Sequence, residues 1–384
     1  MIVEYIHRTM SEAINEASQY FPVITLTGPR QSGKSTLLRH LFPSLPYMTM
    51  ENPDIRSEAK IDPKGFLTTF TNGVIIDEVQ HVPELLSYIQ GIVDESPDRR
   101  FYLSGSSQFS LLKNVTQSLA GRTAVFELLP LSLDEIYRLK KDDNIDRLLY
   151  DGFYPAIWSG KNLPRLLYPN YIKTYLERDV RDLLAIKDLD LFQRFIRLCA
   201  ARIGSVFVAS ELSNELGVAV NTITSWLSVL QASYIIYMLP PFFANTRKRL
   251  TKSPKIYFTD SGVAAYLLDI DSPQVMNRDK MRGHLFENMV IMNFLKDRFN
   301  KGVNGGLYFY RDSNGNEVDL LVKSGSQYCC YEIKSSATFH SDFSKGLKNF
   351  EKNYPELVKD KSVIYTGSKM PDFEGVRIIN FNDI

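Results

Sequence analysis

The stretch Gly28-Pro29-Arg30-Gln31-Ser32-Gly33-Lys34-Ser35 decides the fold of the N-terminal region. It fits the pattern G-x-x-x-x-G-K-[ST], in which backbone amides surround the phosphates of a nucleotide. An apolar run at 23–26 precedes it, and a helical apolar pattern begins at Thr36. This order of strand, glycine loop and helix predicts a phosphate-binding loop, to which the helix N-terminus adds partial positive charge.

The loop residues have separate predicted tasks. We expect Lys34 to reach the β- and γ-phosphates and the Ser35 hydroxyl to bind Mg²⁺, with ATP as the nucleotide. A short polar side chain after the strand at 101–104 could touch the γ-phosphate or the attacking water; Ser106, Ser107 and Gln108 are the candidates, and plain turn chemistry is the alternative. The predicted nucleotide-binding residues are Gly28, Pro29, Arg30, Gln31, Ser32, Gly33, Lys34, Ser35, Thr36 and Ser106.

A second apolar run, 73–76, ends in Asp77-Glu78. We expect Asp77 to hold Mg²⁺, directly or through water, and Glu78 to orient and polarise the attacking water. In phosphoryl transfer the protein mainly positions groups and neutralises developing charge, so hydrolysis needs one carboxylate for the metal and one for the water. The alternative is a strand that ends in a solvated acidic turn.

Arg122 lies just before the strand expected at 123–128, at the edge of this region. We expect it to reach a neighbouring subunit's nucleotide site as an arginine finger, which would make the protein a homo-oligomer. Guanidinium suits this task because its planar fork binds phosphate oxygens and keeps its charge. A solvated or salt-bridged arginine is the alternative.

Composition sets wider bounds. The 384 residues are enough for two or three domains, and the net charge of +1 gives no global footprint for binding a polyanion. The three cysteines, Cys199, Cys329 and Cys330, are spaced for neither a disulfide framework nor a zinc site. Because no signal peptide or membrane-spanning run is visible, we expect a cytoplasmic protein without membrane contact.

Residues 204–260 have the pattern of a winged helix-turn-helix. Ser210 is expected to cap one helix, Gly217 to end it and Asn221 to cap a second helix. A basic wing, with Arg247, Lys248, Arg249 and Lys252, could contact the phosphates of DNA or RNA. The second helix offers no Arg or Lys for reading bases, so a role in protein–protein contact remains equally open.

A different constellation lies near the C-terminus. Glu332 and Lys334 would share one face of a strand, with Asp319 on the adjacent strand. Two carboxylates suit a second Mg²⁺ or Mn²⁺, and the lysine would orient water or neutralise charge. Glu287, from the preceding helix, is a further metal-ligand candidate. This is the D…(D/E)-x-K arrangement of restriction-endonuclease-like folds; a hairpin with a structural Glu–Lys pair, or an inherited but inactive fold, are the alternatives.

Together these motifs resemble a prokaryotic family of AAA-type P-loop ATPases with a C-terminal domain of unknown function. The resemblance implies a sensor role for Ser106 or Ser107, a finger role for Arg122 and, less directly, a lid role for Arg178. One departure is Gly152-Phe153-Tyr154-Pro155, where the family usually has Gly-Gly-Tyr-Pro. The resemblance also includes the stretches Ala120-Gly121-Arg122, Leu129–Ser132 and Pro254–Gly262.

The expected fold class is therefore α/β: a P-loop NTPase with a three-layer parallel sheet, then a helical lid, a winged helix and a restriction-endonuclease-like α/β domain. Its expected function is Mg²⁺-dependent ATP hydrolysis that drives domain motion, acting on nucleic acid. The alternative is an ATP-dependent switch that binds protein partners; a small-molecule kinase is disfavoured. The expected boundaries are 1–20 for an N-terminal helix, 21–145, 146–203, 204–272 and 273–384.

Overall fold

The computed structural model describes residues 5–106, 115, 118–175, 188–242 and 253–384. Its first part is a five-stranded sheet whose strands are all parallel, in the order β2-β3-β4-β1-β5. This confirms the predicted parallel α/β sheet, because the apolar runs of the sequence all became strands. The strands are β1 (Val23–Thr27), β2 (Tyr47–Thr49), β3 (Gly73–Asp77), β4 (Arg100–Gly105) and β5 (Thr123–Glu127).

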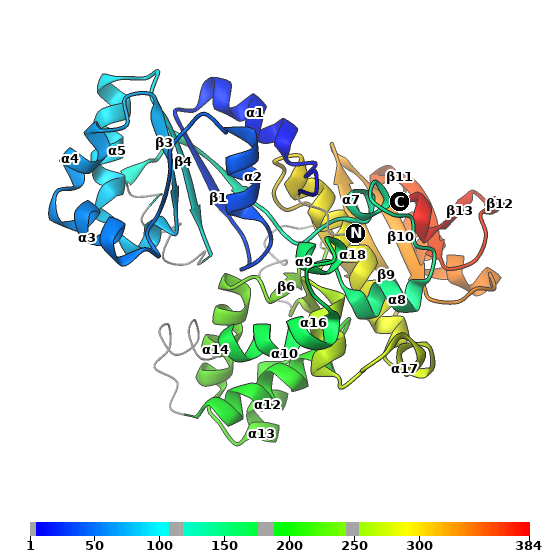
Figure 1. Ribbon diagram of the computed structural model, residues 1–384. Coiled ribbons are helices and arrows are strands. Elements are labelled where there is room, and N and C mark those ends of the chain that lie inside the picture. The colour runs from blue at the N-terminus through cyan, green and yellow to red at the C-terminus, as the bar shows by residue number, and fades with distance from the viewer. Residues whose placement is uncertain (1–4, 107–114, 116–117, 176–187, 243–252) are drawn as a thin grey trace.

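Helices cover both faces of this sheet and complete three layers (Figure 1). One face packs its alternate residues, among them Ile24 and Leu26, against α1 and α2. The other face packs Val74 and Ile76 against the remaining helices, which include the apolar side of α5. The helices are α1 (Ser11–Tyr20), α2 (Lys34–Leu41), α3 (Pro53–Ile61), α4 (Pro63–Thr68) and α5 (Glu84–Glu95).

The N-terminal helix is shorter than the predicted range of 1–20. It begins at Ser11, and the described residues before it, from Tyr5 onward, are not helical. Arg8 in this segment is only 3% exposed. In a helix of the expected length, Arg8 would lie on the helix surface. Instead its guanidinium hydrogen-bonds the carbonyls of Ser32 and Leu129, and these contacts hold the segment in a non-helical conformation.

The described residues between 133 and 278 form small helices and the antiparallel strand pair β6–β7, called here the β6–β7 hairpin. In the region expected to be a winged helix, two helices precede the antiparallel pair β6 and β7. Gly217 ends the first helix in the left-handed conformation, as expected, but the caps were wrong: the helices begin at Ala209 and Val220, so Ser210 and Asn221 lie in their first turns. The elements are α7 (Leu133–Tyr137), α8 (Ile145–Asp151), α9 (Pro155–Trp158), α10 (Pro164–Tyr175), α12 (Leu189–Ala200), α13 (Ala209–Leu216), α14 (Val220–Ala232), β6 (Ile236–Leu239), β7 (Lys255–Phe258), α16 (Ser261–Leu267) and α17 (Pro273–Arg278).

The long helix α18 (Arg282–Asn300) leads into a second, six-stranded sheet of order β12-β13-β11-β10-β9-β8. Strands β8, β9 and β10 are an antiparallel meander, and β11 returns parallel to β10 after α19. Alternate sheet residues pack toward the core that contains α18 and toward α19. The elements are β8 (Leu307–Arg311), β9 (Glu317–Ser324), β10 (Gln327–Lys334), α19 (Lys345–Asn353), β11 (Val358–Tyr365), β12 (Met370–Phe373) and β13 (Val376–Asn380).

One buried cluster joins the middle helices, the β6–β7 hairpin and α18. At its centre Asp260, which is 1% exposed, accepts hydrogen bonds from the amides of Phe153, Gly262 and Val263 at 2.7, 2.9 and 3.1 Å. Since one carboxylate satisfies buried amides from two separate segments, the turn at 152–155 is tied directly to the start of α16.

Gly152 tests this junction. It has φ +65°, and a Cβ there would lie 2.2 Å from the Tyr168 hydroxyl and 2.4 Å from Asp260 Oδ1. We expect Gly152→Ala to lower the free energy of unfolding by at least about 2 kcal/mol, because strain and overlap act together. The control is Gly91→Ala in α5, which meets no atom within 4 Å and should stabilise by about 0.5–1 kcal/mol. Urea unfolding measures both, and equal stability of the two variants would contradict the assignment.

Candidate nucleotide site

The parallel sheet brings three predicted segments to one edge. The glycine loop follows β1, Asp77 ends β3, and Ser106 follows β4. Strand β4 pairs with both β1 and β3, so it lies between the loop and the acidic pair. Because parallel strands place their carboxyl ends on the same side, residues up to 78 positions apart in the sequence meet here.

Two glycines give the loop its path. Gly28 has φ +143°, and a Cβ there would lie 2.2 Å from the Leu128 carbonyl oxygen, so the loop passes directly against the chain after β5. Gly33 has φ +97° and precedes the first turn of α2. The buried Lys34 amine donates to the carbonyls of Gly28 and Pro29 at 2.9 and 2.8 Å. The lysine therefore spans the loop from inside its curve.

Ser35 and Asp77 meet directly. The Ser35 hydroxyl donates to Asp77 Oδ2 at 2.8 Å, and the same carboxylate accepts from Ser104 Oγ at 2.5 Å and from the Tyr47 hydroxyl at 2.6 Å. Burial and the Asp77 carboxylate raise the pKa of Tyr47 to about 12, so it remains a donor. The Ser35 and Asp77 oxygens are hard ligands of the kind that Mg²⁺ takes, so the residues fit the expected ion.

Sequence reasoning missed Tyr47 and Ser104, the two groups that orient Asp77. A tyrosine in a short strand and a serine near a strand end have no distinctive sequence pattern. The strand register brings them to the carboxylate. In β4, Ser104 itself pairs with Asp77, and in β2, Thr49, two residues after Tyr47, pairs with Asp77.

Glu78 lies next to this group, with φ +52°. Its Oε2 accepts hydrogen bonds from the Ser106 amide at 3.3 Å, from the Ser106 hydroxyl at 3.1 Å and from Gln80 Nε2. Ser106 is thus placed beside the acidic residue. The other candidates after β4, Ser107 and Gln108, lie outside the described residues.

A cavity of about 480 Å³ opens beside the loop. This is within the usual range for small-molecule sites, so it can hold a nucleotide. Loop residues from Arg30 to Thr36 line it together with Glu78. Its other walls were not foreseen from sequence; they come from Tyr5, Ile6, Arg8, Pro155, Ala156, Ser159, Lys161, Tyr171 and Thr174.

Arg122 is not part of this cavity wall. It precedes β5, whose first residue, Thr123, pairs with Val23 at the start of β1. The phosphate-binding loop follows the other end of β1, so Arg122 lies at the opposite ends of the strands, about 15 Å from the loop. Its guanidinium pairs with Asp94 through bonds of 2.6 and 2.8 Å. A role in the nucleotide site of its own chain is excluded by this position, while a role in a neighbour's site stays a prediction.

The predicted C-terminal residues also come together. The Lys334 amine lies 2.6 Å from Glu332 Oε1 and 3.3 Å from Asp319 Oδ2, and Asp319 also accepts the Ile333 amide at 2.8 Å. The buried Glu332 Oε2 has no hydrogen-bond partner among the described residues. Figure 1 shows the strands that carry these residues, β9 and β10, beside α18, which carries Glu287.

The hairpin of the middle region reaches this cluster, which the sequence did not reveal. From β7, the Tyr257 hydroxyl donates to Glu287 Oε1 at 2.5 Å, and the buried Lys255 amine lies 3.5 Å from the same oxygen and also pairs with Glu317. The cluster therefore contains two lysines and four carboxylates from three parts of the chain.

Burial and mutual repulsion perturb these carboxyls. Burial, and then the Asp319 charge, raise the pKa of Glu332 to about 8 and that of Glu287 to about 7. Burial alone would lower the pKa of Lys334, but Asp319 and Glu332 raise it. In the described structure the lysine amines partly offset this crowding of carboxyl groups.

Comparison with known proteins agrees with the site at the glycine loop. Residues 20–137 match the family model described as an AAA domain. An uncharacterized protein of Mycobacterium tuberculosis, Rv2008c, is 32% identical over 343 residues, which cover 88% of this chain and 75% of the relative; its Mycobacterium bovis counterpart, Mb2031c, matches equally. This chain belongs to their family of AAA-domain P-loop ATPases.

A weaker similarity to another protein and two further family models cover the rest of the chain. The uncharacterized protein MJ1544 of Methanocaldococcus jannaschii is 22% identical over 338 residues, covering 82% of this ATPase and 69% of the relative. Residues 142–274 and 282–384 match two domains of unknown function, DUF8612 and DUF4143. The Walker-type ATPase PABY2304 of Pyrococcus abyssi superposes with a TM-score of 0.45 at 16% identity, covering 67% of this chain and 94% of that one.

In the part of the chain that the structure describes, every helix is too short or too polar to cross a membrane. The basic wing of 245–252 and Arg178 lie outside the described residues.

Tyr47 provides a test of the metal site. We expect Tyr47→Phe to weaken Mg²⁺ affinity in the presence of nucleotide by roughly tenfold, because partners that orient a metal-binding carboxylate are typically worth that much. Mg²⁺ titrations of ATP hydrolysis measure the effect. Tyr102→Phe is the control, since that hydroxyl lies near Ser18 and away from Asp77; equal Mg²⁺ dependence of the two variants would remove Tyr47 from the site.

Proposed function

We propose that this ATPase binds ATP with Mg²⁺ in the cavity beside the glycine loop and hydrolyses it there. The observation that carries the proposal is the meeting of Ser35 with Asp77, beside Glu78, at the mouth of the loop. Ser35 and Glu78 line the cavity together with the loop, and Asp77 accepts the hydrogen bond of the Ser35 hydroxyl. Bound Mg²⁺ would neutralise charge on the phosphates.

In this proposal each side chain has a limited task. The loop amides and Lys34 bind the phosphates, Ser35 and Asp77 hold the ion, and Glu78 orients water and accepts its proton. The Ser106 hydroxyl, 3.1 Å from Glu78 Oε2, fixes the direction of that carboxylate. Arg122 of a neighbouring subunit would complete the site from outside, so turnover would depend on assembly.

Two substitutions separate binding from hydrolysis. Lys34→Ala should abolish measurable ATP binding, because it removes the buried cation that faces the phosphates. Glu78→Gln should keep ATP binding but lower kcat by at least about a hundredfold, since a general base contributes that much. Calorimetry and phosphate release measure the two effects. Normal turnover by Glu78→Gln would remove Glu78 from the mechanism, and ATP binding by Lys34→Ala would contradict the loop assignment.

We also propose a second centre, formed by Asp319, Glu332 and Lys334, that binds Mg²⁺ or Mn²⁺ and cleaves phosphodiester bonds of nucleic acid. The unpartnered Glu332 Oε2 supports it, because a buried carboxylate oxygen without a donor is costly unless a ligand satisfies it. The order of α18, the β8–β10 meander, α19 and the parallel β11 also supports a restriction-endonuclease-like fold. The ATPase would then gate this chemistry through domain motion.

Metal binding at this centre should depend on pH. Protons compete with the metal for carboxyls of raised pKa, so Mn²⁺ affinity should increase as pH rises from below about 7 to above about 8. Calorimetric titration with Mn²⁺ in the absence of nucleotide measures it. Asp319→Asn should lose this binding, whereas Asp360→Asn on β11, which removes an ion pair with Arg377 of β13, should keep it.

If Asp319→Asn binds Mn²⁺ like the wild type and no DNA or RNA is cut with either metal, with or without ATP, the second centre is a structural ion cluster. The favoured role is then the alternative: an ATP-dependent switch whose C-terminal modules bind protein partners. The near-neutral net charge favours this alternative, because it gives no general attraction for nucleic acid.

A further inference from the structure

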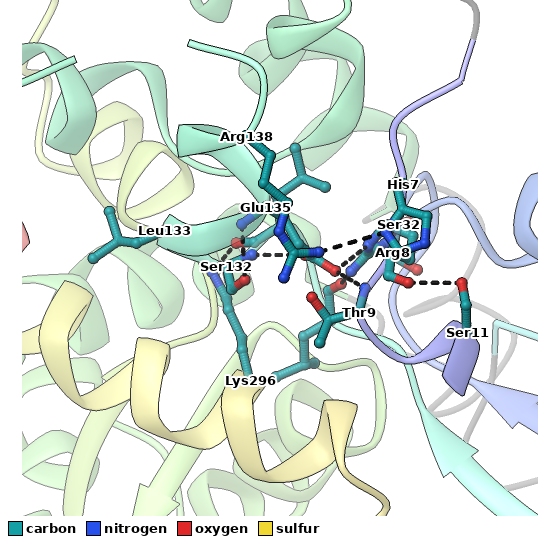
Figure 2. Close-up of polar contacts among 12 residues, drawn as sticks. His7, Arg8, Thr9, Ser11, Ser32, Ser132, Leu133, Glu135, Arg138 and Lys296 are labelled. Carbon is teal, nitrogen blue, oxygen red and sulfur yellow. Dashed lines mark hydrogen bonds and ion pairs between the residues drawn. The ribbon is translucent and has the colours of Figure 1, made fainter. Parts of the chain in front are cut away.

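Arg8 connects the phosphate-binding loop to a segment more than a hundred residues away. Its guanidinium donates to the Ser32 carbonyl at 2.6 Å, to the Leu129 carbonyl at 2.7 Å and to Glu135 Oε1 at 3.1 Å. Figure 2 shows Arg8 between Ser32 and Glu135, with both partners in hydrogen-bond contact. Arg8 lies before the part of the chain that matches the AAA domain, which begins at residue 20.

We propose that Arg8 is a positioning residue of the nucleotide site: it holds the Ser32 carbonyl so that the Gly33 amide faces the phosphates. The proposal rests on the proposed ATP site. In a trans peptide the carbonyl and the following N–H point in opposite directions, and the described chain has no cis peptide bond. With the Ser32 oxygen fixed on Arg8, the N–H of Gly33 must point away from Arg8.

The loop needs this contact because the peptide between Ser32 and Gly33 could otherwise adopt several orientations. Gly33 has φ +97° and no side chain, and a Cβ there would have only Arg8 Nη1 at 3.8 Å and Pro155 Cγ at 4.0 Å as neighbours. Glycine next to a rotatable peptide leaves the amide free to turn. Arg8 removes that freedom before the nucleotide arrives, so less ordering has to occur on binding.

Glu135 keeps the guanidinium in place. Its carboxylate also accepts the amides of Thr9 and Ser132 at 2.7 and 2.9 Å, and with the Ser132 hydroxyl it forms the capping box of α7. Burial alone would raise the pKa of Glu135, but the Arg8 charge and these amides lower it. The carboxylate therefore stays ionised near neutral pH and fixes Arg8 Nε.

The segment that carries Glu135 is itself attached to α18. The Lys296 amine donates to the Leu131 carbonyl at 2.9 Å, and Asn293 Oδ1 accepts the Leu133 amide at 2.9 Å. Figure 2 shows Lys296 rising from α18 toward this segment. The anchor of the phosphate loop is thus built on the same short segment that fixes the long helix of the C-terminal part.

Arginine is required by this geometry. Its planar fork supplies three donors in fixed directions, toward one carboxylate and two carbonyls, while lysine supplies one rotatable ammonium. Arg8→Lys keeps the charge opposite Glu135, so the ion pair and the fold should persist, but its single nitrogen cannot occupy the three separate positions from which Nε, Nη1 and Nη2 bind their acceptors. The variant therefore isolates the positioning of Ser32 from the neutralisation of Glu135.

The test compares Arg8→Lys with Arg282→Lys. Arg282 has similar chemistry, donating to Asp146 Oδ1 at 2.6 Å and to the Ser335 carbonyl at 2.8 Å, but it does not line the nucleotide cavity. ADP and ATP affinities are measured by calorimetry, KM and kcat by phosphate release, and stability by urea unfolding without nucleotide. Wild-type protein that binds neither nucleotide would refute the proposed ATP site itself.

Arg8→Lys should weaken ADP and ATP binding roughly ten- to a hundredfold, the worth of a hydrogen bond to a charged group. KM should rise by a similar factor, with a smaller change in kcat. Arg282→Lys should keep wild-type affinity even where its loss of stability equals that of Arg8→Lys. The proposal is overturned if Arg8→Lys binds both nucleotides like the wild type, or if Arg282→Lys loses affinity in proportion to stability.

Discussion

The conformation of the phosphate-binding loop depends on contacts from outside the loop as well as on the Lys34 amine, which binds the Gly28 and Pro29 carbonyls from inside it. Gly28 presses against the chain at Leu128, and the Ser32 carbonyl is bound by Arg8. Neither contact lies within the loop. The nucleotide cavity is therefore a property of the assembled chain, including segments before and after the AAA domain.

The same principle applies to the acidic groups. Asp77 is oriented by three hydroxyl donors, two of them on neighbouring strands, so the parallel register sets the direction of the carboxylate. At the other end of the chain, Glu287, Asp319 and Glu332 are crowded by burial, and lysines on β7 and β10 lie beside them. The Asp77 carboxylate is bound by hydroxyls, whereas Glu332 Oε2 has no hydrogen-bond partner among the described residues.

Helix α18 relates the two centres. It carries Glu287 near its beginning, and Asn293 and Lys296 near its end hold the segment whose Glu135 binds Arg8. The β6–β7 hairpin also contacts both regions. Tyr234, just before β6, hydrogen-bonds Thr27 at the end of β1 at 2.7 Å, and Tyr257 of β7 hydrogen-bonds Glu287 in the C-terminal cluster. These contacts connect the nucleotide site and the C-terminal cluster through one helix and one strand pair.

The sequence by itself determined the parallel sheet, the glycine loop, the acidic pair and the C-terminal triad, because these depend on local spacing and on strand periodicity. It did not determine the partners Tyr47, Ser104, Arg8 and Lys255, the true start of α1, or the position of Arg122 at the far edge. Those were decided by tertiary structure, since buried hydrogen bonds between distant residues carry no local signal. A residue such as Arg8 is indistinguishable from a surface arginine until the chain folds around it.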